Sequence, residues 1–341
     1  MELSNSMEQS MGKSLVIGID IGHHSIKAVA LKPSKGTLTL VSYRELPIES
    51  DIFTDNHMLN YQKIVKKLKE LRKALPLFSR KVALAIPDSA VISKVLQIDS
   101  EIETQEREFA IMQAFSHQSP FPVEELNLDF VEVNKTGAGS SMSSYQVYAT
   151  RRDVVESRTQ ALAKAGYQPI LTEVQAHSLA NIWQLAASTQ HKRDWILLDV
   201  GLTQSSVCMD LPERAPFCKD IALGTQHIES EAEFEHLAHS STERFIFALV
   251  EKLQRNIQLL TSVHTTPIQG IWLSGGGAAT PMLAEEIARR LNIECELLNP
   301  LSLFTPANGK ATVGQANGYA YSTAAGLALR GLDWLEQEHA A

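Results

Sequence analysis

Cysteine is scarce in this chain. The three cysteines, Cys208, Cys218 and Cys295, are an odd number at irregular spacing. A disulfide framework needs paired cysteines and an oxidising compartment, so this usage predicts free thiols in a cytoplasmic protein.

Long hydrophobic runs are also missing. No stretch approaches the roughly 18 consecutive apolar residues of a membrane span. The N-terminal MELSNSMEQSMGKSLV lacks the apolar core of a signal peptide. The sequence therefore predicts a cytoplasmic protein without direct membrane insertion, and residues 1–13 are expected to form a flexible lead-in.

An excess of positive charge is the third absence. The formal net charge is −8, whereas general nucleic-acid binding needs a basic surface that displaces counterions from phosphates. The composition is otherwise that of a soluble globular protein, with 44% hydrophobic and 21% charged residues. A chain of 341 residues exceeds the roughly 250–300 at which one core stops growing, so two lobes are expected.

Strands alternate with helices along the chain, which predicts the α/β class. Apolar residues at helical spacing predict one helix that carries Ile64, Leu68, Leu71 and Leu75, and a long helix that carries Ile246, Leu249, Leu253, Ile257 and Leu260. Residues 82–150 have a different texture. VALAI and VLQI are short strands, Ser100 and Glu103 predict a capping box before a helix, and two strands flank the flexible linker NKTGAGSSMSS. This pattern predicts a small α+β insertion.

One structural unit occurs twice. IGIDIGHHSIKAVALK at 17–32 and ILLDVGLTQSSVCMD at 196–210 each join an apolar strand, an Asp-x-Gly, a polar turn and a returning strand. Glycine lets backbone N–H groups approach an anion, while Asp20 and Asp199 would repel a phosphate unless a cation such as Mg²⁺ lay between them. Facing one another, two such hairpins would grip a polyphosphate. The alternative is two ordinary β-turns.

A third motif is the triple glycine Gly275-Gly276-Gly277, between the strand IWLS and a helix near Pro281. Its backbone can pack against the ribose and ring of a nucleotide. Alone it is weak evidence, but the three motifs in this order are stronger. The predicted first loop comprises Asp20, Gly22, His23, His24, Ser25 and Lys27, and the second Asp199, Gly201, Thr203 and Gln204. Lys27, inside the returning strand, faces either the ligand or solvent.

The order of these motifs resembles the actin-like ATPase superfamily. The matching segments are DIGHHSIKAV and DVGLTQSSV for the phosphate loops, LSGGGAATPML for the adenosine motif, and TEVQAHSLA and STAAGLALRG for the connecting helices. Within this superfamily the chain resembles the PilM family of type IV pilus assembly proteins, which is similar in fold to the division protein FtsA. That resemblance extends from Leu15 to Trp334 and includes IPDSAVISKVLQID and YATRRDVV.

The resemblance implies a two-lobed actin-like (ribonuclease H-like) ATPase fold with an FtsA/PilM-type small α+β insertion subdomain. The implied organisation is the first part of lobe 1 at 14–81, the insertion at 82–150, the rest of lobe 1 with a connecting helix at 151–194, lobe 2 at 195–318, and a helix returning to lobe 1 at 319–341.

It also implies a function. Proteins of this family bind ATP and Mg²⁺ in the interlobe cleft, which implies that Asp20 and Asp199 lie near the metal and hold it through water. A groove beside the insertion would receive the cytoplasmic N-terminal peptide of PilN, linking the protein peripherally to the PilN/PilO complex of the inner membrane. Pilus motor ATPases and further copies of the chain are additional expected partners.

Three further residues receive roles from the resemblance or their position. Glu173 matches a connecting-helix carboxylate near the metal and the attacking water, although a lone Glu at a strand end is often structural. Glu251 and Arg255 are candidates for the purine side of the pocket. His23 and His24 replace the small hydroxyl residues of relatives and are either phosphate donors or turn residues. The short acidic segment between Gly224 and Thr242 puts hydrolysis in more doubt than binding.

Other functions remain open at this point. A small-molecule kinase of the same superfamily would need an Asp base near its substrate. An FtsA-like membrane-tethered polymer would need a basic amphipathic C-terminus, whereas GLDWLEQEHAA is short and acidic. The nucleotide could also be purely structural. A metal site at His227, His236 and His239 is disfavoured because they lack ordered ligand spacing.

Overall fold

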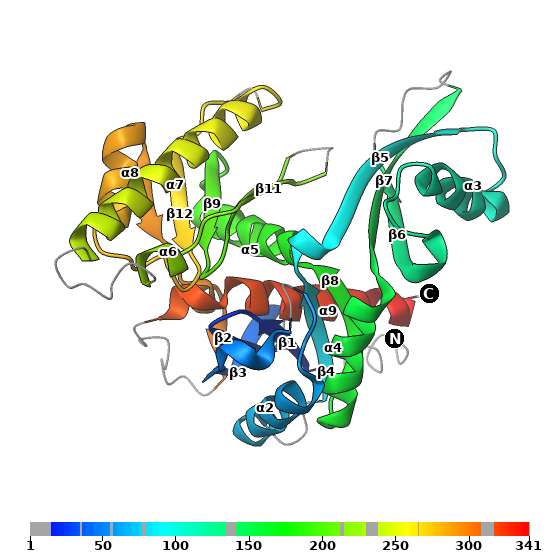
Figure 1. Ribbon diagram of the computed structural model, residues 1–341, viewed down its shortest axis with the longest axis horizontal. Coiled ribbons are helices and arrows are strands. Elements are labelled where there is room, and N and C mark those ends of the chain that lie inside the picture. The colour runs from blue at the N-terminus through cyan, green and yellow to red at the C-terminus, as the bar shows by residue number, and fades with distance from the viewer. Residues whose placement is uncertain are drawn as a thin grey trace.

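The computed structural model describes most of the chain (Figure 1). The described residues are 15–34, 36–54, 57–76, 80–133, 141–211, 215–229, 238–264, 266–307 and 317–340. The predicted lead-in at 1–13, most of the predicted linker and His236 fall outside these ranges.

Two mixed sheets with the same strand arrangement form the two lobes. The first has the order β14-β3-β2-β1-β4-β8, in which β3, β2 and β1 are an antiparallel meander and β4 and β8 continue in parallel. The second repeats this with β11-β10-β9 followed by β12 and β13. The bounds are β1 Val16–Ile21, β2 Ser25–Ser34, β3 Thr37–Pro47, β4 Lys81–Ile86, β8 Gln168–Val174, β14 Thr305–Pro306, β9 Trp195–Val200, β10 Ser205–Met209, β11 Phe217–Ile221, β12 Gly270–Ser274 and β13 Glu294–Leu297.

The first sheet is buried on both faces, because successive side chains of a strand point to opposite sides. Ile17 and Ile19 of β1 share a core with α2 (Tyr61–Ala74) and α4 (Arg152–Lys164). Val16 belongs to a second core with α5 (Gln175–Gln190) and α9 (Ser322–Ala340). The helix predicted from the spacing of Ile64, Leu68, Leu71 and Leu75 is confirmed as α2, in which the first three of these residues are buried.

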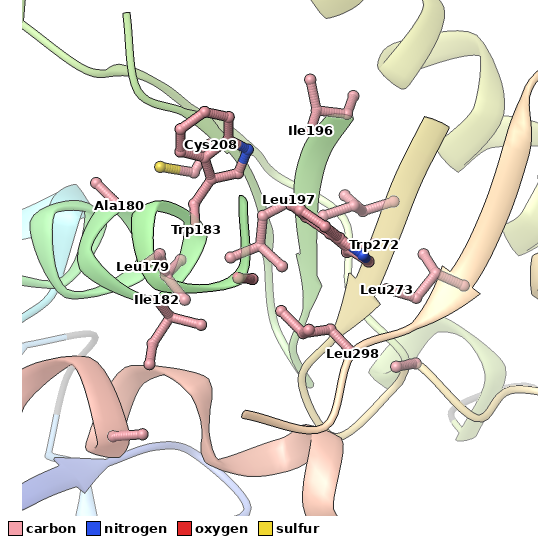
Figure 2. Packing of buried hydrophobic residues seen from close by; sticks show 14 of the residues in the cluster. Leu179, Ala180, Ile182, Trp183, Ile196, Leu197, Cys208, Trp272, Leu273 and Leu298 are labelled. Carbon is pink, nitrogen blue, oxygen red and sulfur yellow. The ribbon is translucent and has the colours of Figure 1, made fainter. Parts of the chain in front are cut away.

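The core around α5 and α9 continues into the second lobe. Figure 2 shows Leu179, Ile182 and Trp183 of α5 beside Leu197 of β9 and Trp272 of β12. Trp183 Nε1 also donates a hydrogen bond to the carbonyl of Trp195 at 2.6 Å. The outer helices of this lobe are α6 (Gln226–Glu229), α7 (Ala238–Thr261) and α8 (Leu283–Leu291), and α7 confirms the second predicted helix. Helices α5 and α9 therefore connect the lobes through one continuous core.

A third, smaller sheet stands apart from the other two (Figure 1). Its order is β5-β7-β6, with β5 Val91–Asp99, β6 Leu126–Glu132 and β7 Met142–Arg151 all paired antiparallel. Helix α3 (Thr104–Ser116) covers it through Ile111 and Phe115, which are fully buried. This unit has its own apolar core, so the predicted strand, helix and hairpin of the α+β insertion are present.

Two details of the predicted insertion differ. The strand VALAI is β4 of the six-stranded sheet, where it pairs with β1 and β8. The predicted capping box at Ser100 and Glu103 is wrong, because the helix begins at Thr104 and Glu103 occupies the N-cap without a side-chain hydrogen bond. Asp99 instead closes a separate turn, accepting from the N–H of Glu101 at 2.9 Å.

Short 3-10 turns lie between these elements. They are η1 Ser50–Ile52, η2 Asp88–Ala90, η3 Val123–Glu125, η4 Pro300–Leu303 and η6 Gly318–Tyr321. Within the described ranges, no helix combines the length and the apolar character needed to cross a membrane.

Candidate functional site

The two predicted hairpins are built alike. After β1, the Gly22 N–H donates to the carbonyl of Ser25 at 3.1 Å. After β9, the Gly201 N–H donates to the carbonyl of Gln204 at 2.9 Å. In both cases the strand before the glycine carries the aspartate, and the strand after it returns antiparallel. The sequence repeat is therefore a single structural device used once in each lobe.

The hairpins face one another across an interlobe cavity of about 210 Å³. Thr203 Oγ1, on the second hairpin, lies 3.4 Å from Nδ1 of His23 on the first. The cavity brings together most of the predicted site residues: Asp20, Gly22, His23, His24, Lys27, Asp199, Gly201, Thr203, Gln204, Gly275, Gly276 and Gly277. The second hairpin and the triple glycine come about 180 and about 250 residues after the first hairpin, yet all three motifs line one cavity.

Two half-buried aspartates define the electrostatics of this cavity. Burial raises the pKa of Asp20 above its ordinary value, although the charge of Lys27 opposes the rise. Burial also raises the pKa of Asp199 to about 6, despite a hydrogen bond from Ser274 Oγ to its Oδ1 at 2.8 Å. The charge of Asp20 adds to this rise. Two half-buried carboxylates of like charge form a site in which a cation is stabilised.

Lys27 faces the cavity rather than solvent. Its side chain on β2 is buried, and its Nζ lies 3.8 Å from Oε1 of Glu45 on β3. The ammonium group lowers the pKa of both aspartates, so it offsets part of their charge. Oxygen donors with a net negative balance fit Mg²⁺, which prefers oxygen ligands and retains several waters. Asp20 and Asp199 are the residues that would hold it.

The triple glycine forms a wall of the same cavity. Gly275 has a φ of +87°, which favours glycine, and a Cβ there would lie 2.4 Å from the carbonyl oxygen of Val200. The Gly277 N–H donates to that same carbonyl at 2.8 Å, which fixes the turn on β9. A Cβ on Gly276, by contrast, would meet no atom within 4 Å. Gly276 therefore presents bare backbone to open space, where a flat ligand can pack.

Four predicted site residues do not occur among the described residues that line this cavity. Ser25 is fully buried and donates its hydroxyl to Glu45 Oε1 at 2.6 Å. Glu251 and Arg255 are exposed on α7, whose opposite face buries Leu253. The fourth residue is Glu173.

Glu173 lies at the end of β8 and faces away from the cavity. Its Oε1 is 2.9 Å from His177 Nδ1, and its Oε2 accepts from Arg330 Nε at 3.1 Å. Burial alone would raise the pKa of Glu173, but the hydrogen bonds from His177, Val174 and Arg330 hold it below its ordinary value. Both carboxylate oxygens are thus engaged in a structural network.

Sequence reasoning missed several residues of the cavity. Gln175, the first residue of α5, lines it two positions after Glu173. Its position at the start of the connecting helix was the available signal. Glu45 and Phe53 also line the cavity, and Phe53 stacks on His23 with ring centroids 4.3 Å apart and an interplanar angle of 18°. No motif marked these two residues.

A second cavity, of about 760 Å³, separates the small subdomain from lobe 1. We call it the subdomain groove. One side comprises Met112 of α3 with Leu128 and Val131 of β6, and the other comprises Glu173, His177 and Arg330. Tyr148 of β7 meets the His177 ring edge to face, with centroids 4.8 Å apart. The subdomain side therefore combines apolar side chains with the carboxylates of Glu108 and Asp129, and the lobe side adds a cluster of charged groups.

The cysteines are all free. Cys208 and Cys218 are cross-strand partners on β10 and β11, and their Sγ atoms lie 3.0 Å apart. For the histidine group, His227 Nδ1 lies 3.0 Å from the carbonyl of Gly224, while His236 and the side chain of His239 are not described.

Two lobes of duplicated topology, each contributing an Asp-x-Gly hairpin to a shared cleft with a glycine turn, define the actin-like ATPase fold. Solved structures agree with this class. The PilM–PilN type IV pilus biogenesis complex matches with a TM-score of 0.77 and 22% identity, covering 93% of this chain and 98% of that one. A nucleotide-free diol dehydratase-reactivating factor gives 0.55 at 9% identity, and glycerol dehydratase reactivase gives 0.53 at 9%, each covering 94% of this chain and 100% of the other.

The family follows from the sequence itself. The model of the type IV pilus assembly protein PilM family matches residues 18–236 and 230–332. The chain belongs to this family.

Proposed function

We propose that this protein binds ATP with Mg²⁺ in the interlobe cavity and, in that state, presents the subdomain groove to the cytoplasmic N-terminal tail of PilN. The observation that carries the nucleotide part is the convergence of both hairpins and the glycine turn on one cavity that contains two half-buried aspartates. Binding to PilN would place the protein peripherally at the inner membrane, in contact with the PilN/PilO complex.

Each lining group has a role in this proposal. The N–H groups and hydroxyls of the hairpin turns bind phosphate oxygens, and Gly276 packs against the adenosine. Asp20 and Asp199 hold the metal through water. Bound Mg²⁺ supplies charge neutralisation for the phosphates. Lys27 balances the remaining negative charge of the two aspartates.

The site favours retention of ATP over rapid turnover. The carboxylates among the described lining residues are Asp20, Asp199 and Glu45. The first two are assigned to the metal, and Glu45 is held by Ser25 and Lys27. None of these described carboxylates is then left as a base for the attacking water, or for the hydroxyl substrate of a small-molecule kinase. Glu173 has no catalytic role in this proposal, because its carboxylate lines the subdomain groove and does not line the interlobe cavity.

The partner assignment has two supports. The PilM structure that matches over 98% of its length was solved as a complex with PilN. The subdomain groove of this chain, at about 760 Å³, is large and half apolar, which suits a short peptide segment. Glu108, Asp129 and Glu173 lie along it, so a basic residue in the peptide would find an opposite charge.

A peptide titration tests this proposal. A synthetic peptide of the PilN cytoplasmic tail should bind the wild type in the presence of Mg-ATP. Met112→Glu and Val131→Glu should each weaken binding about tenfold or more, because a charge would replace an exposed apolar lining side chain.

Phe109→Glu is the matched control. Phe109 is 70% exposed on the same helix as Met112 but does not line the groove. Equal losses in the Phe109 and Met112 variants, or full binding by both groove variants, would contradict this assignment.

A further inference from the structure

His23 occupies the junction between the two phosphate loops. It belongs to the first hairpin, in lobe 1, and its Nδ1 lies 3.4 Å from the hydroxyl of Thr203 in lobe 2. A group held by both hairpins must pass through this junction. The imidazole is thus a side chain of one lobe positioned where a phosphate bound by both lobes would lie.

The ring of His23 has a fixed orientation. Phe53 stacks on it almost face to face, at 4.3 Å and 18°. Phe53 is itself held by a β-bridge to Leu59. Stacking of this kind leaves the edge of the imidazole, which carries its two nitrogens, free to hydrogen-bond. The neighbouring His24 lacks this confinement, because its side chain is exposed at the same turn.

The imidazole also has a defined charge state. Burial, together with the nearby charges of His57 and Arg158, lowers the pKa of His23. The ring is therefore neutral at neutral pH and has one N–H donor and one acceptor. A neutral N–H donor can approach a phosphate without adding a second positive charge to that of Lys27 in the cavity.

The interlobe cavity is small for a nucleotide. Small-molecule sites usually measure roughly 300–1,000 Å³, whereas the interlobe cavity has about 210 Å³. We therefore expect a nucleoside triphosphate to bind with the hairpins farther apart. Such a movement breaks the contact between His23 and Thr203 and frees the imidazole edge toward the ligand.

We propose that His23 recognises the terminal phosphate of a nucleoside triphosphate: in the empty cleft it joins the loops through Thr203, and in the occupied cleft it donates its N–H to that phosphate. This inference rests on the proposed function, since it requires that the cavity bind a nucleotide. It adds a specificity determinant by which the protein holds the triphosphate more tightly than the diphosphate.

The test compares affinities for Mg-ATP and Mg-ADP, measured by isothermal titration at the same pH. His23→Ser should weaken ATP binding about tenfold or more, as expected for a lost hydrogen bond to a charged group. It should change ADP binding by less than about threefold, so the ratio of the two affinities falls. His117→Ser, at an exposed histidine after α3 that does not line the cavity, should leave the ratio unchanged.

Two further variants separate recognition from a general disturbance of the fold. His23→Gln keeps a neutral N–H donor of similar reach and should retain most of the ratio. Phe53→Leu keeps the imidazole but removes its stacking partner, so the ratio should fall in the same direction as in His23→Ser.

Each outcome decides the question. An unchanged ratio in His23→Ser, or equal losses in His23→Ser and His117→Ser, would overturn the inference while leaving ATP binding intact. A wild type that binds neither nucleotide would overturn the proposed function and this inference with it. A wild type that binds ADP as tightly as ATP would overturn the inference alone.

Discussion

Asp88 illustrates how a single buried carboxyl can serve the fold at an electrostatic cost. It follows β4, and its Oδ1 accepts a hydrogen bond from the Ala176 N–H at 3.1 Å. Val174, the N-cap residue of α5, makes no side-chain cap, so Asp88 supplies one from a distant segment. Its Oδ2 is buried and has no hydrogen-bond partner among the described residues. Burial, with the charge of Asp220 adding to it, raises the pKa of Asp88 to about 7.

Asp88→Asn should stabilise the protein at alkaline pH. Because the pKa of Asp88 is raised on folding, wild-type stability is fully present below the unfolded value of 3.8 and falls as pH rises toward about 7. Asparagine is neutral throughout and keeps the oxygen that accepts from Ala176. Its free energy of unfolding should exceed that of the wild type by about 2 kcal/mol or more at pH 8, and the advantage should vanish below about pH 4.

Urea unfolding at several pH values measures this difference. Asp88→Ala, which removes both the charge and the cap, should be less stable than Asp88→Asn by about 1 kcal/mol at every pH. An Asn variant that is no more stable than the wild type at pH 8 would show that the buried charge carries no such cost.

At the scale of the element, α9 depends on small residues where it crosses its neighbours. A Cβ on Gly326 would lie 1.9 Å from the carbonyl oxygen of Ser178 in α5. Close contact between these two helices is what connects the lobes, so the glycine here serves packing. The glycine wall of the interlobe cavity differs, because Gly276 faces open space.

Gly326→Ala and Gly276→Ala should therefore differ in their effect on stability. The first forces α5 and α9 apart and should cost about 3 kcal/mol. The second adds a methyl group to open space and should change the free energy of unfolding by less than about 0.5 kcal/mol. Thermal or urea unfolding without nucleotide measures both, and equal stabilities would contradict the crossing geometry.

Local patterns in the sequence predicted individual helices and hairpins well. They predicted the contacts between these elements less well. Both Asp-x-Gly hairpins and helix α2 followed from motifs and spacing, because turn chemistry and helical periodicity are local. Glu45 could not be predicted as a neighbour of Lys27, since the register of β2 with β3 brings these residues opposite one another. Glu173 was assigned from its place in a motif, yet the strand places it toward the groove and the next helix begins with Gln175 in the cavity.

At the scale of the whole molecule, the two cavities share their walls. Pro87, Ser89 and Gln175 line the interlobe cavity, while Ile86, Val91 and Val174 from the same two segments line the subdomain groove. The hydrogen bond between Asp88 and the Ala176 N–H joins these segments. A shift of either segment would alter both cavities.

Nucleotide and peptide binding should consequently affect one another. We expect the dissociation constant of the PilN tail peptide to change at least about fivefold between nucleotide-free and Mg-ATP-saturated protein. Thermodynamic reciprocity requires saturating peptide to change the affinity for ATP by the same factor. Titrations in both directions measure the two factors, and peptide binding that is insensitive to nucleotide would show that the shared walls are rigid.

The interlobe site itself is tested most directly by titrating Mg-ATP into nucleotide-free wild type, Asp199→Asn and Asp210→Asn, with and without Mg²⁺. Asp210 provides the matched control, since its carboxylate accepts from Gln184 and does not line the cavity. We expect magnesium-dependent ATP binding by the wild type and by Asp210→Asn, and a loss of about tenfold or more in Asp199→Asn. Binding by Asp199→Asn equal to the wild type, or no binding by the wild type, would contradict the metal-assisted nucleotide site.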